Sequence, residues 1–226
     1  MAASVEAVVR ARTAEDVVVG KVIVRHRLAS RAIHWAVAAF FLVSLLTGFP
    51  IWTPVFGWMA GFFGGLSVCR VLHPWAGLLY FAASLGMFFN WEREMRLAPG
   101  DREWLGRKVF RYMSFLEEDP DVGKYNGGQK LFFFAVSLAA LGLLASGLLL
   151  WWSTSLPQPL RVAGILLHEV TFILLAVAIV LHIYMGTAAE PGTFGSMTRG
   201  TVTAAWARLH HPRWHREVTD GRPHRP

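Results

Sequence analysis

The sequence predicts an all-α integral membrane protein, a bundle of four transmembrane helices with both termini in the cytoplasm. Of its 226 residues, 54% are hydrophobic and only 16% are charged. A typical soluble domain carries about 25% charged residues. Here the charges lie between four long apolar stretches, and nearly all the positive ones lie on one predicted side of the membrane. A bilayer interior offers no water to backbone groups, so stretches that cross it must be helical.

The four apolar stretches each reach the roughly 20 residues that a helix needs to cross a bilayer. The first lacks a small-residue cleavage site, so we interpret it as a retained span and not as a signal peptide. The chain is therefore expected to form a single membrane domain over residues 1–226, with a cytoplasmic arm (1–30) and a cytoplasmic tail (187–226). The predicted spans cover residues of about 32–53, 71–91, 131–152 and 162–186.

The distribution of the 22 Lys and Arg residues predicts the orientation. Six lie in residues 1–31, eight in the 92–130 loop and six after residue 186, which leaves only Arg70 and Arg161 on the other side. Positively charged loops stay in the cytoplasm, so the termini and the 92–130 loop are expected there. That loop is also expected to contain an amphipathic helix on the membrane surface. The net charge of +7 suits anionic lipid headgroups, and nothing in its distribution indicates nucleic-acid binding.

The other connecting segments carry weaker signals. A short extended piece is expected around Val17–Val24. The glycine-rich stretch Val55–Cys69 is too short to cross and is expected at the outer interface or as a re-entrant segment. The first span is expected to be closed by Pro50 and Pro54. The second span is expected to open at Leu72-His73-Pro74, with His73 at or near its N-cap, because Pro favours the first helical position.

Four histidines lie within these apolar stretches or at their ends: His34, His73, His168 and His182. Ionisable side chains are costly at membrane depth and usually have a function there. His168 and His182 are fourteen residues apart in one span. Fourteen residues of helix rise about 21 Å and return to within roughly 40° of the same face. These two side chains therefore face the same way near opposite sides of a core about 30 Å thick.

Depth in the membrane pairs the four histidines across helices. His34 and His182 lie near the inner ends of the first and fourth spans, and His73 and His168 lie toward the outer ends of the second and fourth. Each pair is predicted to hold one iron between two imidazoles, which gives two non-covalent haem b groups, an inner and an outer one. A haem with both axial positions filled transfers electrons and does not activate a substrate.

The remaining histidines and the cysteine are interpreted more simply. A single intramembrane histidine is also compatible with a packing residue or a proton relay, and only the pairing by depth favours haem. Cys69 alone excludes an internal disulfide, a Cys-x-x-Cys-His haem site and a cysteine-ligated iron–sulfur cluster. Glu169 is assigned no catalytic role. The histidines outside the spans are expected to be solvated or partner-contacting residues: His26, His210, His211, His215 and His224.

A polar run from Tyr125 to Lys130 precedes the third span on the cytoplasmic side. The amides of Asn126 and Gln129 offer hydrogen bonds, Gly128 allows a ligand to approach the backbone, and a helix N-terminus favours negative charge. His182 is expected at the same depth. These features suit a quinone, and simple capping of the third span by Asn126 or Gly127 explains them equally well.

Several short motifs together resemble the gamma subunit of membrane-bound formate dehydrogenase, a cytochrome b subunit. The resemblance covers nearly the whole chain from about residue 25, and the departures are the longer N-terminal arm and the glycine-rich stretch. The motifs that carry it are Arg31-Ala-Ile-His34-Trp35, Thr47-Gly48, Arg70-Val-Leu-His73-Pro74, Lys124-Tyr-Asn-Gly-Gly-Gln-Lys130, His182-Ile-Tyr184, Pro191-Gly192 and Trp206-Ala-x-x-His210-His211-Pro212-x-Trp214.

The resemblance implies a dihaem anchor in a bacterial inner membrane with two partner subunits. An iron–sulfur beta subunit would deliver electrons to the outer haem, and an alpha subunit with a molybdenum or tungsten cofactor would oxidise formate. The electrons would continue to the inner haem and reduce menaquinone or ubiquinone near the cytoplasm. The resemblance also places Asn126, Gly128, Gln129 and His182 at the quinone. The chain itself is not expected to catalyse formate oxidation.

Two other functions remain open on the sequence. A cytochrome b subunit of a nickel–iron hydrogenase or of a thiosulfate reductase shares the dihaem logic, and the metal of the catalytic partner distinguishes it. A haem-free membrane anchor, or a small transporter that uses histidines as proton relays, belongs to a different class. An absorption spectrum distinguishes that class from a cytochrome.

Overall fold

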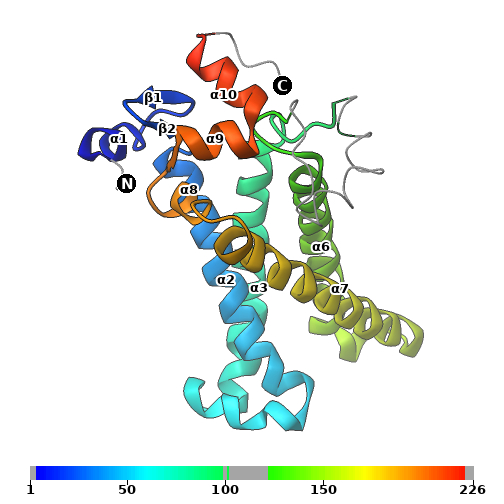
Figure 1. The fold of residues 1–226 in the computed structure, drawn as a ribbon. Coiled ribbons are helices and arrows are strands. Elements are labelled where there is room, and N and C mark those ends of the chain that lie inside the picture. The colour runs from blue at the N-terminus through cyan, green and yellow to red at the C-terminus, as the bar shows by residue number, and fades with distance from the viewer. Residues whose placement is uncertain (1–3, 99–100, 102–121, 222–226) are drawn as a thin grey trace. The chain divides into compact units, whose positions relative to one another are not determined.

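The computed structural model describes residues 4–98, 101 and 122–221 (Figure 1). Within these residues, four helices are long and apolar enough to cross a membrane. α2, for example, has 25 residues and is about 38 Å long at 1.5 Å per residue. The predicted all-α membrane protein with four spanning helices is confirmed. The helices are α2 (Leu28–Trp52), α3 (Leu66–Trp91), α6 (Gly127–Trp151) and α7 (Gln158–Tyr184), and α7 continues into the π-helical turn η4 (Met185–Ala189).

The second spanning helix begins earlier than predicted. α3 starts at Leu66, so His73 lies about two turns inside the helix and not at its N-cap. The expectation was wrong because Pro74, which was taken to mark the first turn, is accommodated inside α3. A proline inside a helix removes one backbone hydrogen bond and can be tolerated at that cost. α2 likewise continues through Pro50.

The stretch between α2 and α3 contains a short 3-10 helix, η1 (Pro54–Phe63). Thr53 caps its start by accepting a hydrogen bond from the Val55 N–H. Gly64 and Gly65 follow with φ of 89° and 112°, a conformation that glycine adopts without steric cost, and α3 then begins. Ten residues of 3-10 helix rise only about 20 Å, which agrees with the prediction that this stretch does not cross.

The chain divides into two compact units. Unit 1 comprises residues 1–32, 89–135 and 180–226, and unit 2 comprises residues 33–88 and 136–179. Each spanning helix contributes residues to both units. A single membrane domain over the whole chain stays a prediction. The amphipathic helix expected in the 92–130 loop falls mostly on residues outside the described ones.

Unit 1 contains a small antiparallel sheet in the order β1-β2-β3. β1 (Val17–Val19) and β2 (Val22–Val24) form a hairpin, which confirms the predicted extended piece. β3 (Thr201–Thr203) pairs with β2 from the other end of the chain. Gly200, at φ 83°, precedes β3, and a Cβ there would lie 2.5 Å from the His26 carbonyl oxygen. Glycine is therefore required where the two chain ends meet.

Short helices surround this sheet and supply its core. The helix α10 carries the fully buried Trp214, and α9 carries Trp206 and Ala207. They pack with Ile23 of β2 and Val202 of β3. The core therefore joins a segment that precedes the four spanning helices in the sequence to a segment that follows them. The short helices are α1 (Val5–Arg10), α8 (Phe194–Thr198), α9 (Ala204–His210) and α10 (Pro212–Thr219).

Two histidines that were expected to be solvated are buried in unit 1. His26 is 2% exposed and His211 is 1% exposed. The Nδ1 atom of His211 lies 2.7 Å from the Gly123 carbonyl oxygen. Burial, together with the nearby positive charge of Arg25, lowers the pKa of His211 well below its usual value. The expectation was wrong for these two residues because their aromatic and backbone neighbours lie far away in the sequence.

Candidate functional site

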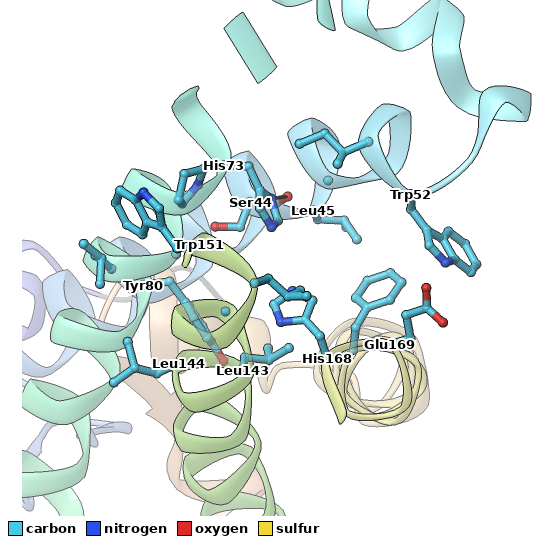
Figure 2. Close-up of a pocket in the computed structure, with 18 of the residues that line it drawn as sticks. Ser44, Leu45, Trp52, His73, Tyr80, Leu143, Leu144, Trp151, His168 and Glu169 are labelled. Atoms are coloured by element: carbon cyan, nitrogen blue, oxygen red, sulfur yellow. Dashed lines mark hydrogen bonds between the residues drawn. The ribbon is translucent and has the colours of Figure 1, made fainter. Parts of the chain in front are cut away.

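The predicted outer pair, His73 and His168, meets inside unit 2 (Figure 2). The two ring centroids are 6.1 Å apart and the ring planes make an angle of 70°. His73 comes from α3 and His168 from α7, so the pair joins two spanning helices. Imidazole nitrogens bind metal ions at about 2 Å, so two rings at this spacing could hold one metal ion between them.

Hydrogen bonds at the Nδ1 atoms determine which nitrogen of each ring is available to a ligand. Nδ1 of His73 lies 2.9 Å from the carbonyl oxygen of Ser44 on α2. A carbonyl oxygen only accepts, so Nδ1 carries the proton and Nε2 keeps its lone pair. This is the arrangement typical of metal-binding histidines, in which the second nitrogen donates to a carbonyl or another oxygen.

His168 has an equivalent partner on α6. Its Nδ1 atom lies 3.0 Å from the hydroxyl oxygen of Ser146. That hydroxyl donates its one proton to the Gly142 carbonyl oxygen at 2.7 Å. Its oxygen therefore accepts from Nδ1–H of His168, which again leaves the Nε2 lone pair for coordination. All four spanning helices thus contribute one of the two imidazoles or the group that orients it.

The two rings line a cavity of about 560 Å³ between parts of α2, α3, α6 and α7 that belong to unit 2. This volume lies within the range of about 300–1,000 Å³ that is usual for ligand and cofactor sites. The lining is mostly apolar and aromatic, and its charged members are Arg70 and Glu169. A large apolar cavity with two inward imidazoles suits a porphyrin with an axial ligand on each face.

Two glycines lie beside the histidine rings. A Cβ added at Gly48 of α2 would lie 3.0 Å from Cε1 of His73, which is closer than side chains normally pack. A Cβ at Gly147 of α6 would lie 3.7 Å from Cε1 of His168, which is ordinary contact. Gly48 is therefore the tighter of the two positions, and the sequence motif Thr47-Gly48 has a direct structural reason.

The predicted inner pair is distributed over the two units. His34 belongs to unit 2 and makes an edge-to-face contact with Trp35, with ring centroids 5.3 Å apart. His182 belongs to unit 1 and stacks on Phe132 of α6 at 4.8 Å, with the rings almost parallel. The pairing of His34 with His182 stays a prediction.

The polar run before α6 forms a capping box. The Asn126 N–H donates to Oε1 of Gln129 at 3.0 Å, and the Gln129 N–H donates to Oδ1 of Asn126 at 2.8 Å. The capping role that the sequence allowed is therefore present. The capping box uses the carboxamide oxygens of Asn126 and Gln129. It does not use their NH₂ groups, which are hydrogen-bond donors. Phe132, which stacks on His182, follows Gln129 by about one helical turn, so His182 lies beside the start of α6.

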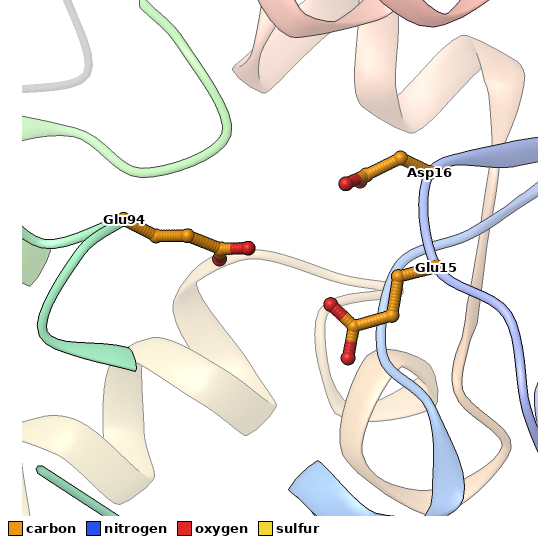
Figure 3. Close-up of side chains that lie close together, drawn as sticks. All are labelled: Glu15, Asp16 and Glu94. Atoms are coloured by element: carbon orange, nitrogen blue, oxygen red, sulfur yellow. The ribbon is translucent and has the colours of Figure 1, made fainter. Parts of the chain in front are cut away.

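A buried lysine beside this run was not predicted from the sequence. Lys124 is 1% exposed, and its Nζ atom lies 3.0 Å from Glu15, 3.2 Å from Asp16 and 3.3 Å from Glu94. Figure 3 shows the three carboxylates turned toward one another. We call Lys124 and these three residues the carboxylate cluster. Their sequence separations reach 109 residues, so no local pattern could have revealed the cluster.

Electrostatics in the carboxylate cluster favour the charged forms. Burial alone would lower the pKa of Lys124, but the neighbouring carboxylates of Asp16, Glu94 and Glu15 outweigh burial and raise it. Burial raises the pKa of Glu15, and the Lys124 ammonium together with hydrogen bonds outweighs burial, so the net shift is downward.

Arg25 fixes the backbone of the same lysine. Its guanidinium is buried and donates to the Lys124 carbonyl oxygen at 2.5 Å. It lies over the rings of Tyr125, Trp206 and Trp214 at 5.3, 5.1 and 5.1 Å from the ring centroids. Such cation–π contacts are strongest when they are desolvated, as here. Other segments of unit 1 therefore hold both the side-chain ammonium and the backbone carbonyl of Lys124.

Four membrane-spanning helices and two imidazoles oriented through their Nδ1 atoms define a membrane-embedded cytochrome of the b type. The family model of prokaryotic cytochrome b561 matches residues 25–200. The chain belongs to that family. The family is membrane-bound and carries haem b for electron transport, and residues 1–24 precede the matched region.

Curated relatives agree with this assignment. The chain is 35% identical over 199 residues to the cytochrome b556(fdo) subunit of formate dehydrogenase from Escherichia coli K12, covering 87% of this chain and 93% of the relative. It is 33% identical to the cytochrome b556(Fdn) subunit of the nitrate-inducible enzyme from the same strain, covering 88% and 92%. It is also 33% identical to the cytochrome b556 subunit from Haemophilus influenzae, covering 86% and 83%. The resemblance seen in the sequence motifs is confirmed.

Proposed function

We propose that this chain is the dihaem cytochrome b subunit of a membrane-bound formate dehydrogenase. The observation that carries the proposal is the His73–His168 pair, in which both Nδ1 atoms are occupied and both Nε2 atoms are left for iron. The similarity to three formate dehydrogenase cytochrome subunits supports the choice of complex. A haem-free anchor or proton-relay transporter would not need two imidazoles oriented in this way.

Each residue has a defined task in this proposal. His73 and His168 hold the outer haem, and His34 and His182 hold the inner haem. Bis-histidine haem b supplies one-electron transfer without an open position for oxygen or peroxide. The Ser44 carbonyl and the Ser146 hydroxyl keep the outer imidazoles in the ligating tautomer. The apolar lining of the cavity excludes water from the site.

The quinone is placed at the start of α6. The NH₂ groups of Asn126 and Gln129 would donate to the quinone oxygens, Gly128 would allow close approach, and His182 would contact the ring from α7. Menaquinone or ubiquinone would accept two electrons from the chain and two protons from the cytoplasm to give the quinol. The stacking of His182 on Phe132 supports this location.

The partners and the orientation follow from the same assignment. An iron–sulfur beta subunit would deliver electrons at the outer side, and an alpha subunit with molybdenum or tungsten would oxidise formate. Both termini would lie in the cytoplasm, with the spans in the bacterial inner membrane. The strong bias of Lys and Arg toward one side of the spans supports this orientation. Because electrons enter outside and protons are taken up inside, turnover would charge the membrane.

Purification of the intact complex tests the assignment. We expect co-purifying subunits that contain molybdenum or tungsten, low-spin haem bands on dithionite reduction, and two haems per copy of this chain. Nickel in the catalytic partner would transfer the chain to a hydrogenase. Well-folded protein without haem bands would rule out the cytochrome function altogether.

A further inference from the structure

Residues 4–24 form an N-terminal arm that precedes the family-matched region. This arm contacts the segment that leads into α6 through Glu15 and Lys124. Its Glu15 carboxylate accepts three hydrogen bonds: from the Arg27 N–H at 2.9 Å, from the Ser30 hydroxyl at 2.8 Å and from Lys124 Nζ at 3.0 Å. Arg27 directly precedes α2, and Ser30 lies in its first turn. Glu15 therefore connects the start of the first spanning helix to Lys124, which lies two residues before the capping box.

Asp16 extends this connection to the C-terminal part of unit 1. Its carboxylate accepts from Lys124 Nζ at 3.2 Å and from the Trp214 indole N–H at 2.8 Å. Its backbone is in the left-handed region, at φ 57°, which is uncommon for residues other than glycine. A hydrogen bond from its N–H to the Val24 carbonyl oxygen, at 2.7 Å, holds that conformation.

Lys124 transmits these contacts to the start of α6. Its side chain is fixed by the carboxylate cluster, and its carbonyl oxygen is fixed by Arg25. Asn126, which opens the capping box with Gln129, comes two residues later. A shift of the Lys124 backbone would therefore move the amide groups at the start of α6.

We propose that Glu15 and Asp16 are positioning residues for quinone binding: through Lys124, the N-terminal arm sets the position of Asn126 and Gln129. This inference rests on the quinone site proposed above. Neither carboxylate is required to touch the quinone. The arm increases the affinity for quinone, because it holds residues 124–129 in place before the quinone binds.

The variant Glu15→Gln tests the proposal in the purified complex. It keeps the size of the side chain and removes the charge that Lys124 faces. With decylubiquinone as the probe, we expect KM and the equilibrium Kd to rise about tenfold, in line with the cost of a small displacement transmitted to a binding site. We expect kcat to change by less than about twofold, because no reacting group is removed. The haem content and haem reduction by formate should match those of the unaltered complex.

The control is Glu6→Gln, which makes the same change of charge in α1 of the same arm at an exposed position away from the carboxylate cluster. Equal KM values for Glu15→Gln and Glu6→Gln would overturn the proposal. A loss of haem, or a parallel loss of formate-driven haem reduction, would also overturn it by showing a general structural role. Asp16→Asn provides a second variant if Glu15→Gln fails to assemble, and a rise in KM is again required.

The failure of the quinone site itself would look different. The unaltered complex would then reduce its haems with formate but would not pass electrons to decylubiquinone. In that case the proposed function is wrong at this site, whatever the arm variants do. An unaltered complex that binds and reduces the probe, with Glu15→Gln indistinguishable from it, rejects the role of the arm alone.

Discussion

Two places in the molecule remove ionisable side chains from water by opposite means: the cavity of unit 2 and the carboxylate cluster of unit 1. In the pocket, His73 and His168 are oriented by an uncharged carbonyl and an uncharged hydroxyl. In the cluster, the buried ammonium of Lys124 is surrounded by three carboxylates. Removing a charge from water costs several kcal/mol unless it is paired. The comparison shows that unit 2 orients its imidazoles with uncharged partners, whereas unit 1 uses ion pairs to fix a loop.

The largest test of this comparison is the removal of one imidazole. His168→Ala should eliminate the outer haem, because a single axial histidine is left there, while the inner haem survives at least in part. The haem content should fall from two to about one per chain, since the two sites use separate ligands. Reduced-minus-oxidised spectra and a haem assay measure this. Retention of both haems in the variant would show that the proposed ligand pairing is wrong.

A smaller change tests how tightly the pocket is built. Gly48→Ala should displace the His73 ring, because the added Cβ would lie 3.0 Å from Cε1. Overpacking of this kind costs about 1–3 kcal/mol, and we expect a partial loss of the outer haem with a shift in its midpoint potential.

Gly86→Ala is the matched control for this change, because it also adds a Cβ to a spanning helix, it does not line the cavity, and its Cβ meets nothing within 4 Å. Redox titration followed by haem quantification compares the two variants. The same outer-haem content and potential in both would show that the close approach at Gly48 does not matter.

The cap that Gln129 forms and its proposed contact with quinone can be tested separately. Gln129→Ala removes both the cap and the amide donor and should slow quinone reduction about tenfold, while both haems remain reducible from the partner side. Gln129→Glu keeps an acceptor for the Asn126 N–H, as in the usual capping box, and removes the NH₂ donor.

We expect Gln129→Glu to slow quinone reduction as well, with thermal stability close to that of the unaltered protein. Stopped-flow oxidation of pre-reduced haem by decylubiquinone gives the rates, and thermal unfolding gives the stability. Normal rates in Gln129→Glu would leave the residue with a capping role alone. Asn126→Ala should behave like Gln129→Ala, because it removes the other half of the box.

The smallest expected effect concerns the pH dependence of unit 1. Because the folded-state pKa of His211 is lowered from 6.5, only the unfolded chain binds a proton there just below pH 6.5. The stability that this residue contributes is therefore complete above pH 6.5 and falls as the pH decreases toward the folded-state pKa. Each kcal/mol lost should lower Tm by about 2–4 °C in a protein of this size.

His211→Gln should remove this dependence between pH 7.5 and 5.5, and His215→Gln, at a partly exposed position on α10, serves as the control. Tryptophan fluorescence melts at several pH values measure it, because Trp206 and Trp214 lie against the His211 ring. Identical slopes of Tm against pH in both variants would contradict the assigned role of burial.

Local patterns in the sequence were sufficient for the spanning helices and for the outer histidine pair. Hydropathy over about 20 residues and the helical repeat are short-range properties, so the four spans and the shared face of His168 and His182 follow from them. The bounds were less accurate, as at α3, because polar residues extend a helix beyond its apolar part. The tautomers of the histidines required the partners Ser44 and Ser146, which only the structure supplies.

Most of the contacts within unit 1 could not be predicted from the sequence. Lys124 was recognised as the start of a motif, but its partner Glu15 lies 109 residues away. The burial of His26 and His211 was missed for the same reason, since charged and polar neighbours in the sequence indicated solvent. Contacts that join distant segments depend on tertiary packing, which local propensity does not encode.

The hydrogen bond between Asp16 and Trp214 spans 198 residues and has a consequence for biogenesis. Asp16 precedes the four spanning helices in the sequence and Trp214 follows them, so this hydrogen bond cannot form until all four spans have been translated. Contacts of such high sequence separation form late and slowly. The spanning helices can therefore enter the bilayer before Asp16 and Trp214 are joined, and this part of unit 1 closes only afterwards.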